Sequence, residues 1–340
     1  MEPHEIELPR KILVGKGILD NIPSVCESFD IRDKILVISD ETTRKIAGDI
    51  IKDSLSSDIA IIKDSHYSEV ERLKSEHTDI NLVIAAGGGK VIDVGKLLAF
   101  EKEIPFISVP TAPSHDGITS ERVSISDENG KHSVRAKPPI AIIADIDIMM
   151  KAPYKLIASG CADIISNHTA VYDWKLAEKN GEYYSRYAAT LSLLSAEIVL
   201  RSADNIKNLE ERGIRDLVEA LVTSGIAMSL AHTSRPASGS EHLFSHALDQ
   251  LGSGKLHGEQ CGLGAILMAR YQGQDWRAIK SSLERIGAPT TAKEIGLDQD
   301  IIVDALVKAR GVRKRYTILD KKPLDRQSAI ELCKETGVFG

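Results

Sequence analysis

Short apolar runs alternate with helix-length segments through the first half of the chain, and this alternation constrains the fold more than any other feature. The runs lie at residues 34–39, 58–63, 80–86, 105–110 and 140–144. They are largely continuous, as expected for strands that are buried on both faces of a parallel sheet. The sequence therefore predicts a doubly wound, mostly parallel, Rossmann-like α/β domain.

Residues 121–135 break this rhythm. Val123 and Ile125 alternate with polar residues, Asn129-Gly130 is typical of a hairpin turn, and Val134 lies on the return. We expect a β-hairpin inserted into the α/β domain.

Beyond about residue 150 the strand signal fades. Apolar residues recur at helical spacing in residues 183–201, 214–232 and 258–271. Pro153 is suited to the first turn of a helix. We predict an α/β domain at residues 1–152 and an all-α domain at residues 153–340.

Composition limits the classes of function. With 340 residues, 42% hydrophobic and 27% charged, the chain can bury two ordinary cores. The four cysteines form no CxxC, which argues against a disulfide framework or a structural zinc cluster and suits a reducing cytosol. No apolar run reaches the roughly 18 to 20 residues that span a bilayer. The net charge of −6 without a basic cluster disfavours nucleic acid. We expect a cytoplasmic protein with a small-molecule substrate and no membrane span.

A glycine-rich loop separates the run at 80–86 from the helical stretch at 91–100. It reads Gly87-Gly88-Gly89-Lys90. Such glycines let backbone N–H groups approach an anion, and the helix N-terminus adds partial positive charge, so a dinucleotide pyrophosphate would fit here. The spacing matches neither GxGxxG nor GxxxxGK[ST], and a tight strand-to-helix turn without a ligand is the alternative.

Polar residues follow two other strands, at the edge of the sheet where ligands bind in this class of fold. Asp40 comes directly after the run at 34–39, where an acid can hydrogen-bond an adenosine ribose or simply cap a helix. Residues 111–120 are also rich in polar side chains, and we expect them to line a cofactor and a polar substrate.

The helical half contains candidate metal ligands in three separate segments. Asp163 lies in the first, His242 and His246 in the second, and His257 in the third. A carboxylate and two imidazoles can form a three-ligand site with an open position. Spacing alone favours His242 with His246, because residues i and i+4 share a helix face, and leaves either Asp163 or His257 to complete the site. Packing histidines and a capping acid are the alternative.

Several motifs in order resemble the glycerol-1-phosphate dehydrogenases of the archaeal type. These belong to the fold group of glycerol dehydrogenase, iron-containing alcohol dehydrogenase and dehydroquinate synthase. The motifs are Gly87-Gly-Gly-Lys-Val-Ile-Asp93, Thr111-Ala-Pro-Ser-His-Asp116, Gly160-Cys-Ala-Asp163, Gly239-Ser-Glu-His-Leu-Phe-Ser-His246 and Leu256-His-Gly-Glu259. The resemblance extends more loosely to both termini, including Arg313-Lys-Arg-Tyr-Thr-Ile318.

The resemblance implies roles for particular residues. Asp163, His242 and His257 are implied as metal ligands, and Asp116, Asp163 and His246 as residues that contact substrate and take part in catalysis. The implied NAD(P) contacts are Gly87, Gly88, Gly89, Lys90, Val91, Ile92, Asp93, Thr111, Ala112, Pro113, Ser114 and Ser120.

The reaction implied by the resemblance is NAD(P)H-dependent reduction of dihydroxyacetone phosphate to sn-glycerol 1-phosphate, the backbone of archaeal ether phospholipids. A divalent metal would polarise the carbonyl while hydride arrives from the nicotinamide. The ligand set suits Zn²⁺ best, with Fe²⁺ or Ni²⁺ as alternatives. The rival functions are a dehydroquinate-synthase-like lyase and a glycerol or alcohol dehydrogenase that acts on an unphosphorylated substrate.

The sequence leaves several properties open. Asp40 would disfavour NADP, but Arg44 and Lys45 can compensate, so we expect both NAD and NADP to be used. Lys314 and Arg315 are candidates for the substrate phosphate, against the alternative of a solvated charge run. We also expect a homo-oligomer.

Overall fold

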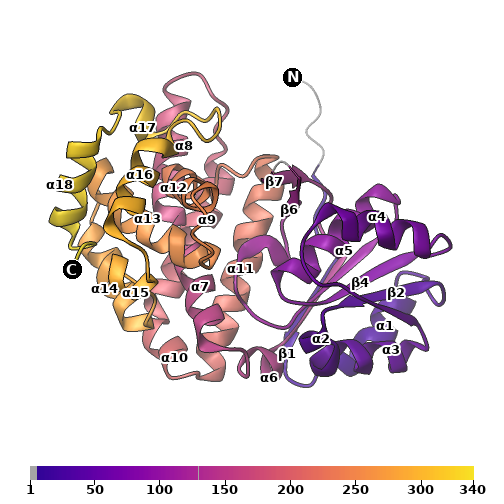
Figure 1. Ribbon diagram of the computed structural model, residues 1–340. Coiled ribbons are helices and arrows are strands. Elements are labelled where there is room, and N and C mark those ends of the chain that lie inside the picture. Colours follow the sequence, from indigo (N-terminus) through magenta and orange to yellow (C-terminus); the bar gives the residue numbers. More distant parts are fainter. Residues whose placement is uncertain (1–5, 129) are drawn as a thin grey trace. The chain divides into compact units, whose positions relative to one another are not determined.

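The computed structural model describes residues 6–128 and 130–340, which divide into two compact units (Figure 1). The first unit ends at Pro153 and the second comprises Tyr154–Gly340. Within the described residues, no helix is both long enough and apolar enough to cross a membrane.

Six parallel strands form the sheet of the first unit, in the order β1-β8-β5-β4-β2-β3. Their bounds are β1 Lys11–Gly15, β2 Ile35–Ser39, β3 Asp58–Ile61, β4 Leu82–Gly87, β5 Phe106–Pro110 and β8 Ala141–Asp145. Every apolar run that predicts a strand is found in this sheet. Strand β1 was not predicted; it is an edge strand whose five residues are only partly buried or exposed.

Helices cover both faces of the sheet, which confirms the doubly wound α/β prediction. Alternate residues of β2 point to opposite sides: Leu36 and Ile38 pack with α4 (Tyr67–Glu76) and α5 (Gly89–Glu101). Ile35 and Val37 pack with α1 (Ile22–Glu27) and α3 (Asp49–Leu55).

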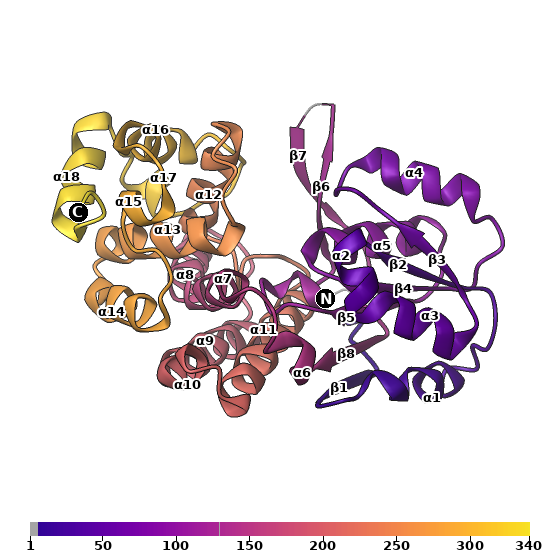
Figure 2. The same cartoon turned by 60° about the horizontal axis from the view of Figure 1, so that its bottom comes forward.

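The hairpin lies where the sequence predicts it. β6 (Arg122–Asp127) and β7 (Gly130–Arg135) pair antiparallel as a separate two-stranded sheet, and Figure 2 shows them extending from the body of the unit. Val123 and Ile125 of β6 are buried beside α5. Asn129 of the predicted turn lies outside the described residues.

The short helices of the first unit are α2 (Glu41–Thr43), α6 (Ile146–Met149), the 3-10 turns at Leu19–Asn21 and Asp116–Ile118, and a π-helical turn at Arg44–Gly48. Asp116–Ile118 lies in the loop after β5. Gly87 at the end of β4 is in register with Pro110 at the end of β5, and the Thr111 N–H donates to the Gly87 carbonyl at 3.1 Å. The two loops that the sequence predicts for the cofactor are therefore neighbours.

All regular structure in the described residues of the second unit is helical, as predicted. The bounds are α7 Tyr154–Ile165, α8 Asn167–Glu178, α9 Arg186–Arg201, α10 Ala203–Lys207, α11 Glu211–Ala231, α12 Ser240–Gln250, α13 His257–Gln272, α14 Trp276–Ile286, α15 Ala292–Ile295, α16 Gln299–Ala309, α17 Ile318–Lys321 and α18 Arg326–Thr336. Helix α13 is buried along most of its length and packs against α7 and α12. These are the helices that carry the candidate metal ligands.

Candidate active site

Three helices bring four possible metal-binding side chains together in the second unit. Asp163 comes from α7, His242 from α12, and His257 and Cys261 from α13, with one ligand atom of each lying within 4.8 Å of the others. The Asp163 Oδ1 lies 3.7 Å from the Nε2 of His242 and 3.7 Å from the Nε2 of His257. The carboxylate and the two imidazoles thus face one point.

A buried carboxylate holds His242 in place. Glu241 Oε1 lies 2.9 Å from His242 Nδ1 and accepts the Gly239 N–H, while Oε2 accepts the Thr169 hydroxyl at 2.7 Å. Burial raises the pKa of Glu241, but the hydrogen bonds that it accepts outweigh this effect and its pKa is lowered overall. Glu241 is therefore an anion that accepts from His242 Nδ1–H, which leaves the Nε2 lone pair facing Asp163.

A hydroxyl orients His257 in the same way. Ser245 Oγ donates to Gln260 Oε1 at 2.7 Å and lies 3.2 Å from His257 Nδ1. Since the hydroxyl proton is used on Gln260, the remaining role for Oγ is to accept from Nδ1–H. The Gln260 amide is fixed in turn by donating to Asp249 Oδ1 and Ser253 Oγ. The Nε2 of His257 is thus also available to a metal.

Cys261 is a member of this cluster that the sequence analysis did not identify. Its sulfur lies 3.5 Å from His257 Nε2 and 3.9 Å from Nδ1, so it stands beside the ring rather than along the lone pair of one nitrogen. Burial, followed by the charges of Asp163 and Glu241, raises the pKa of the thiol well above its usual range. The available signal was its position one helical turn after His257.

The donor set fits a divalent transition metal. One carboxylate and two neutral imidazoles are the ligands of many catalytic zinc sites, which keep a further position for water or substrate. Each imidazole also has the outer hydrogen-bond partner that such ligands require. The cluster consists of a buried acid and two histidines whose Nδ1 atoms are hydrogen-bonded to Glu241 and Ser245. Histidines that serve only in packing do not need this arrangement.

The structure does not bring His246 into this cluster. Its ring centroid lies 6.4 Å from that of His242 and 6.1 Å from that of His257. The His246 Nε2 accepts a hydrogen bond from the Arg313 guanidinium at 2.9 Å. Spacing favoured His246 with His242, completed by either Asp163 or His257. The structure instead brings both Asp163 and His257 to His242 and leaves His246 beside the cluster.

Two glycines of the loop in the first unit lie where a Cβ would collide with a neighbouring side chain. A Cβ on Gly89 would lie 2.1 Å from His115 Nε2, and one on Gly87 would lie 2.6 Å from the Val91 side chain, whereas Gly88 has open space. Helix α5 begins at Gly89, so its first N–H groups lie at the end of β4. The side chains of Val91 and Ile92 are buried in the core, so only their backbone can reach a ligand.

Asp93 and the loop after β5 are tied to the same helix. Asp93 is buried and accepts the Ser124 N–H of the hairpin at 3.1 Å. In the loop, Thr111, Ala112, Pro113 and Ser120 are buried, while Ser114 and Asp116 are partly exposed.

Lys96 holds this loop, and the sequence analysis missed it. Its fully buried ammonium donates to the carbonyls of Gly117, Ser120 and Arg122 at 2.6, 2.8 and 2.9 Å. Burial lowers the pKa of Lys96 to about 8, although the charges of Asp93 and Asp116 raise it. The signal was a single lysine in an otherwise apolar stretch of helix.

Asp40 acts as a helix cap. Its Oδ1 accepts the N–H groups of Thr42 and Thr43, and the Thr43 hydroxyl reaches back to the Asp40 N–H as a capping box. The structure thus shows one of the two roles that the sequence allowed, and the ribose contact stays a prediction.

Comparison with known proteins supports one family. Residues 13–153 match the family model described as iron-containing alcohol dehydrogenase. A glycerol-1-phosphate dehydrogenase [NAD(P)+] of Pyrococcus horikoshii is 49% identical over 99% of this chain and 100% of that protein. The enzyme of the same name from Methanothermobacter thermautotrophicus is 45% identical over the full length of both.

Among solved structures, the glycerol dehydrogenase of Schizosaccharomyces pombe superimposes with a TM-score of 0.81 at 18% identity, covering 99% of this chain and 91% of that one. This likeness concerns the fold. The identity to the curated relatives, over essentially the whole chain, shows that the protein belongs to the family of NAD(P)-dependent glycerol-1-phosphate dehydrogenases.

Proposed function

We propose that the protein reduces dihydroxyacetone phosphate to sn-glycerol 1-phosphate with NADH or NADPH, reversibly, and so supplies the backbone of archaeal ether phospholipids. The observation that carries this proposal is the cluster of Asp163, His242 and His257, in which both imidazoles direct Nε2 at one carboxylate oxygen. The names of the relatives supply the substrate class and the dinucleotide.

Asp163, His242 and His257 would hold the metal, and Zn²⁺ is the ion we propose for this donor set. When bound, such an ion supplies Lewis-acid polarisation of the substrate carbonyl. The protein's own part is to keep the three ligands in place: Glu241 fixes the ring of His242, and Ser245 fixes that of His257.

We propose His246 and Asp116 as further groups that contact substrate. His246 stands beside the cluster and accepts from Arg313 at Nε2, so its proton lies on Nδ1. An imidazole in that position can hold or release a proton for the substrate oxygen. Asp116 begins the 3-10 turn in the loop that Lys96 holds.

The dinucleotide is proposed to bind over the Gly87–Lys90 loop and the neighbouring loop of residues 111–120. Helix α5 directs its N-terminal N–H groups there, as a pyrophosphate requires. We propose that both NAD and NADP are used. The Oδ1 of Asp40 accepts the hydrogen bonds of the helix cap, and Arg44 forms an ion pair with Asp49 at 2.9 Å. Neither residue is therefore committed to selecting NAD over NADP or the reverse.

The test is a spectrophotometric assay of NADH and NADPH oxidation with dihydroxyacetone phosphate, before and after chelation, with the chirality of the product determined. Net oxidation that yields sn-glycerol 1-phosphate and stops on chelation is the expected result. A dehydroquinate-synthase-like lyase would show no net oxidation, and a glycerol dehydrogenase would prefer the unphosphorylated ketone.

A further inference from the structure

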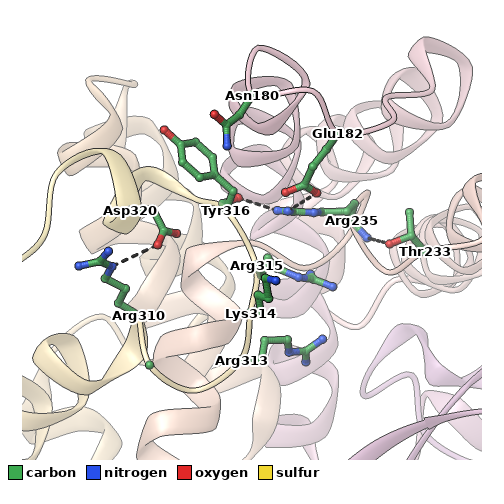
Figure 3. A pocket seen from close by; sticks show the side chains of 11 residues that line it. Asn180, Glu182, Thr233, Arg235, Arg310, Arg313, Lys314, Arg315, Tyr316 and Asp320 are labelled. Carbon is green, nitrogen blue, oxygen red and sulfur yellow. Dashed lines mark hydrogen bonds and ion pairs between the residues drawn. The ribbon is translucent and has the colours of Figure 1, made fainter.

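A basic pocket of about 820 Å³ opens in the second unit. Figure 3 shows that its lining comes largely from the segment between α16 and α17 and from the loop around Arg235. The charged lining residues are Arg235, Arg310, Arg313, Lys314, Arg315, Glu182 and Asp320. Five cations therefore face two carboxylates, in a chain whose net charge is −6.

Both carboxylates of the pocket are already paired. Glu182 accepts from Arg235, whose guanidinium also donates to the Tyr316 carbonyl at 2.7 Å. Asp320 accepts from Arg310 at 3.1 Å. The remaining cations are the three consecutive residues Arg313, Lys314 and Arg315.

These three residues differ in what they do. Arg315 donates to the Ser238 carbonyl and, at 2.7 Å, to the Ser234 hydroxyl, so it pins the loop that leads into α12. Lys314 is exposed. Arg313 is partly buried and donates to His246 Nε2 at 2.9 Å. Its guanidinium thus contacts the histidine that lies beside the metal-binding cluster.

We propose that Arg313 binds the phosphate group of the substrate, and that this contact makes the enzyme select a phosphorylated ketone over an unphosphorylated one. The inference rests on the proposed function and adds the residue that recognises the phosphate. The structure shifts this role from Lys314 and Arg315, the candidates of the sequence analysis, to the neighbour that reaches the cluster.

The chemistry and the distances agree with this role. A guanidinium carries five N–H groups, and its planar fork matches two oxygens of a phosphate. One of these groups donates to His246. His246 lies 6.1 and 6.4 Å, ring to ring, from the two imidazoles of the cluster. A three-carbon ketone whose carbonyl lay at the cluster could then place its phosphate at Arg313.

The test compares kcat/KM for dihydroxyacetone phosphate and for dihydroxyacetone in Arg313→Gln. A hydrogen bond to a charged group contributes about 1.5–3 kcal/mol, so the value for the phosphorylated ketone should fall roughly 10- to 100-fold, mainly through KM. The value for dihydroxyacetone should fall much less, by only the share that the bond to His246 contributes, and Arg313→Lys should recover part of the loss. Zinc content should not change.

The matched control is Arg310→Gln, which removes a cation from the same pocket and should leave both substrates unaffected. Equal losses on both substrates in Arg313→Gln would show that Arg313 acts only by positioning His246, and would overturn the proposal, as would no loss at all.

A second measurement applies where turnover of dihydroxyacetone is too slow to compare. Inorganic phosphate should compete with the phosphorylated ketone in the wild type, and its inhibition constant should rise about tenfold or more in Arg313→Gln. An unchanged constant contradicts the role of Arg313. Failure of the wild type to oxidise NADH with dihydroxyacetone phosphate would instead refute the proposed function itself.

Discussion

The two units hold their candidate functional groups in opposite ways. In the helical unit, side chains fix side chains: Glu241 holds His242, and Ser245 with Gln260 holds His257. In the α/β unit, one side chain fixes the backbone, because Lys96 donates to three carbonyls of the segment that follows Asp116.

This difference reflects what each ligand requires. A metal needs a few lone pairs directed at one point, so the orientation of each donor atom matters. A dinucleotide pyrophosphate is bound largely by backbone N–H groups, so the path of the loop matters more than any one side chain. Damage to the helical unit should therefore appear as loss of metal, and damage at Lys96 as weaker cofactor binding with the metal retained.

The largest expected effect comes from the metal ligands. Asp163→Ala, His242→Ala or His257→Ala should each remove the metal and lower kcat/KM by about a thousandfold or more, since Lewis-acid polarisation contributes several kcal/mol. Plasma mass spectrometry of the purified variants measures the metal, and calorimetry measures dinucleotide binding, which should persist.

His246→Ala is the control for this cluster. It should lower turnover while the metal content stays at the wild-type level. If His246→Ala lost its metal stoichiometrically, the ligand set would have to include His246, as helical spacing alone suggested.

The outer partner of His242 should give the next largest effect. Glu241→Gln keeps the size of the side chain but replaces an anion that accepts from Nδ1–H with a neutral amide. Loss of such a partner weakens metal affinity by about 10- to 100-fold. Competition with a chromophoric chelator measures this change, with the exposed Glu284→Gln as control. Equal metal affinity in Glu241→Gln and wild type would show that the ring of His242 is held by packing instead.

Lys96→Met tests the other half of the comparison. Methionine fills a similar volume but leaves three carbonyls without the ammonium. We expect the KM for NADH to rise about tenfold or more, because hydrogen bonds to a charged group contribute about 1.5–3 kcal/mol. The metal content should be unchanged, and Lys102→Met, at the other end of α5, should behave as wild type. Loss of metal in Lys96→Met would contradict the prediction that Lys96 affects the cofactor loop and not the metal-binding cluster.

The strands of the parallel sheet are predictable because the local sequence pattern carries the information. Continuous apolar runs predicted five strands, because burial on both faces of a parallel sheet leaves no room for polar residues. The edge strand β1 was not predicted, because its apolar run of Ile12, Leu13 and Val14 is short, whereas the other edge strand, β3, has a longer run.

The candidate site was less predictable because it depends on packing between helices. Spacing along α12 pairs His242 with His246, and nothing local shows that α7 and α13 bring Asp163 and His257 to His242 instead. The contact between Arg313 and His246 likewise joins residues 67 positions apart. Lys96 was missed because its partners are backbone carbonyls, which any sequence supplies.

The smallest expected effect is a pH dependence of the wild type at Lys96. Burial lowers the pKa of Lys96 to about 8 from its usual 10.5, against the raising effect of Asp93 and Asp116. Below about pH 8 three ammonium N–H groups match three carbonyls, whereas the neutral amine has only two, so the KM for NADH should rise a few fold as the pH passes 8.

The stability of the fold should increase over the same pH range in which cofactor binding weakens. Between about pH 8 and 10.5 the unfolded chain binds the proton that the folded chain has lost, so this group makes the free energy of unfolding increase with pH. If the KM for NADH rises in the wild type while the free energy of unfolding does not fall, and Lys96→Met shows no such rise in KM, the effect lies in the loop that Lys96 holds. A rise in KM together with a fall in the free energy of unfolding of the wild type would contradict this.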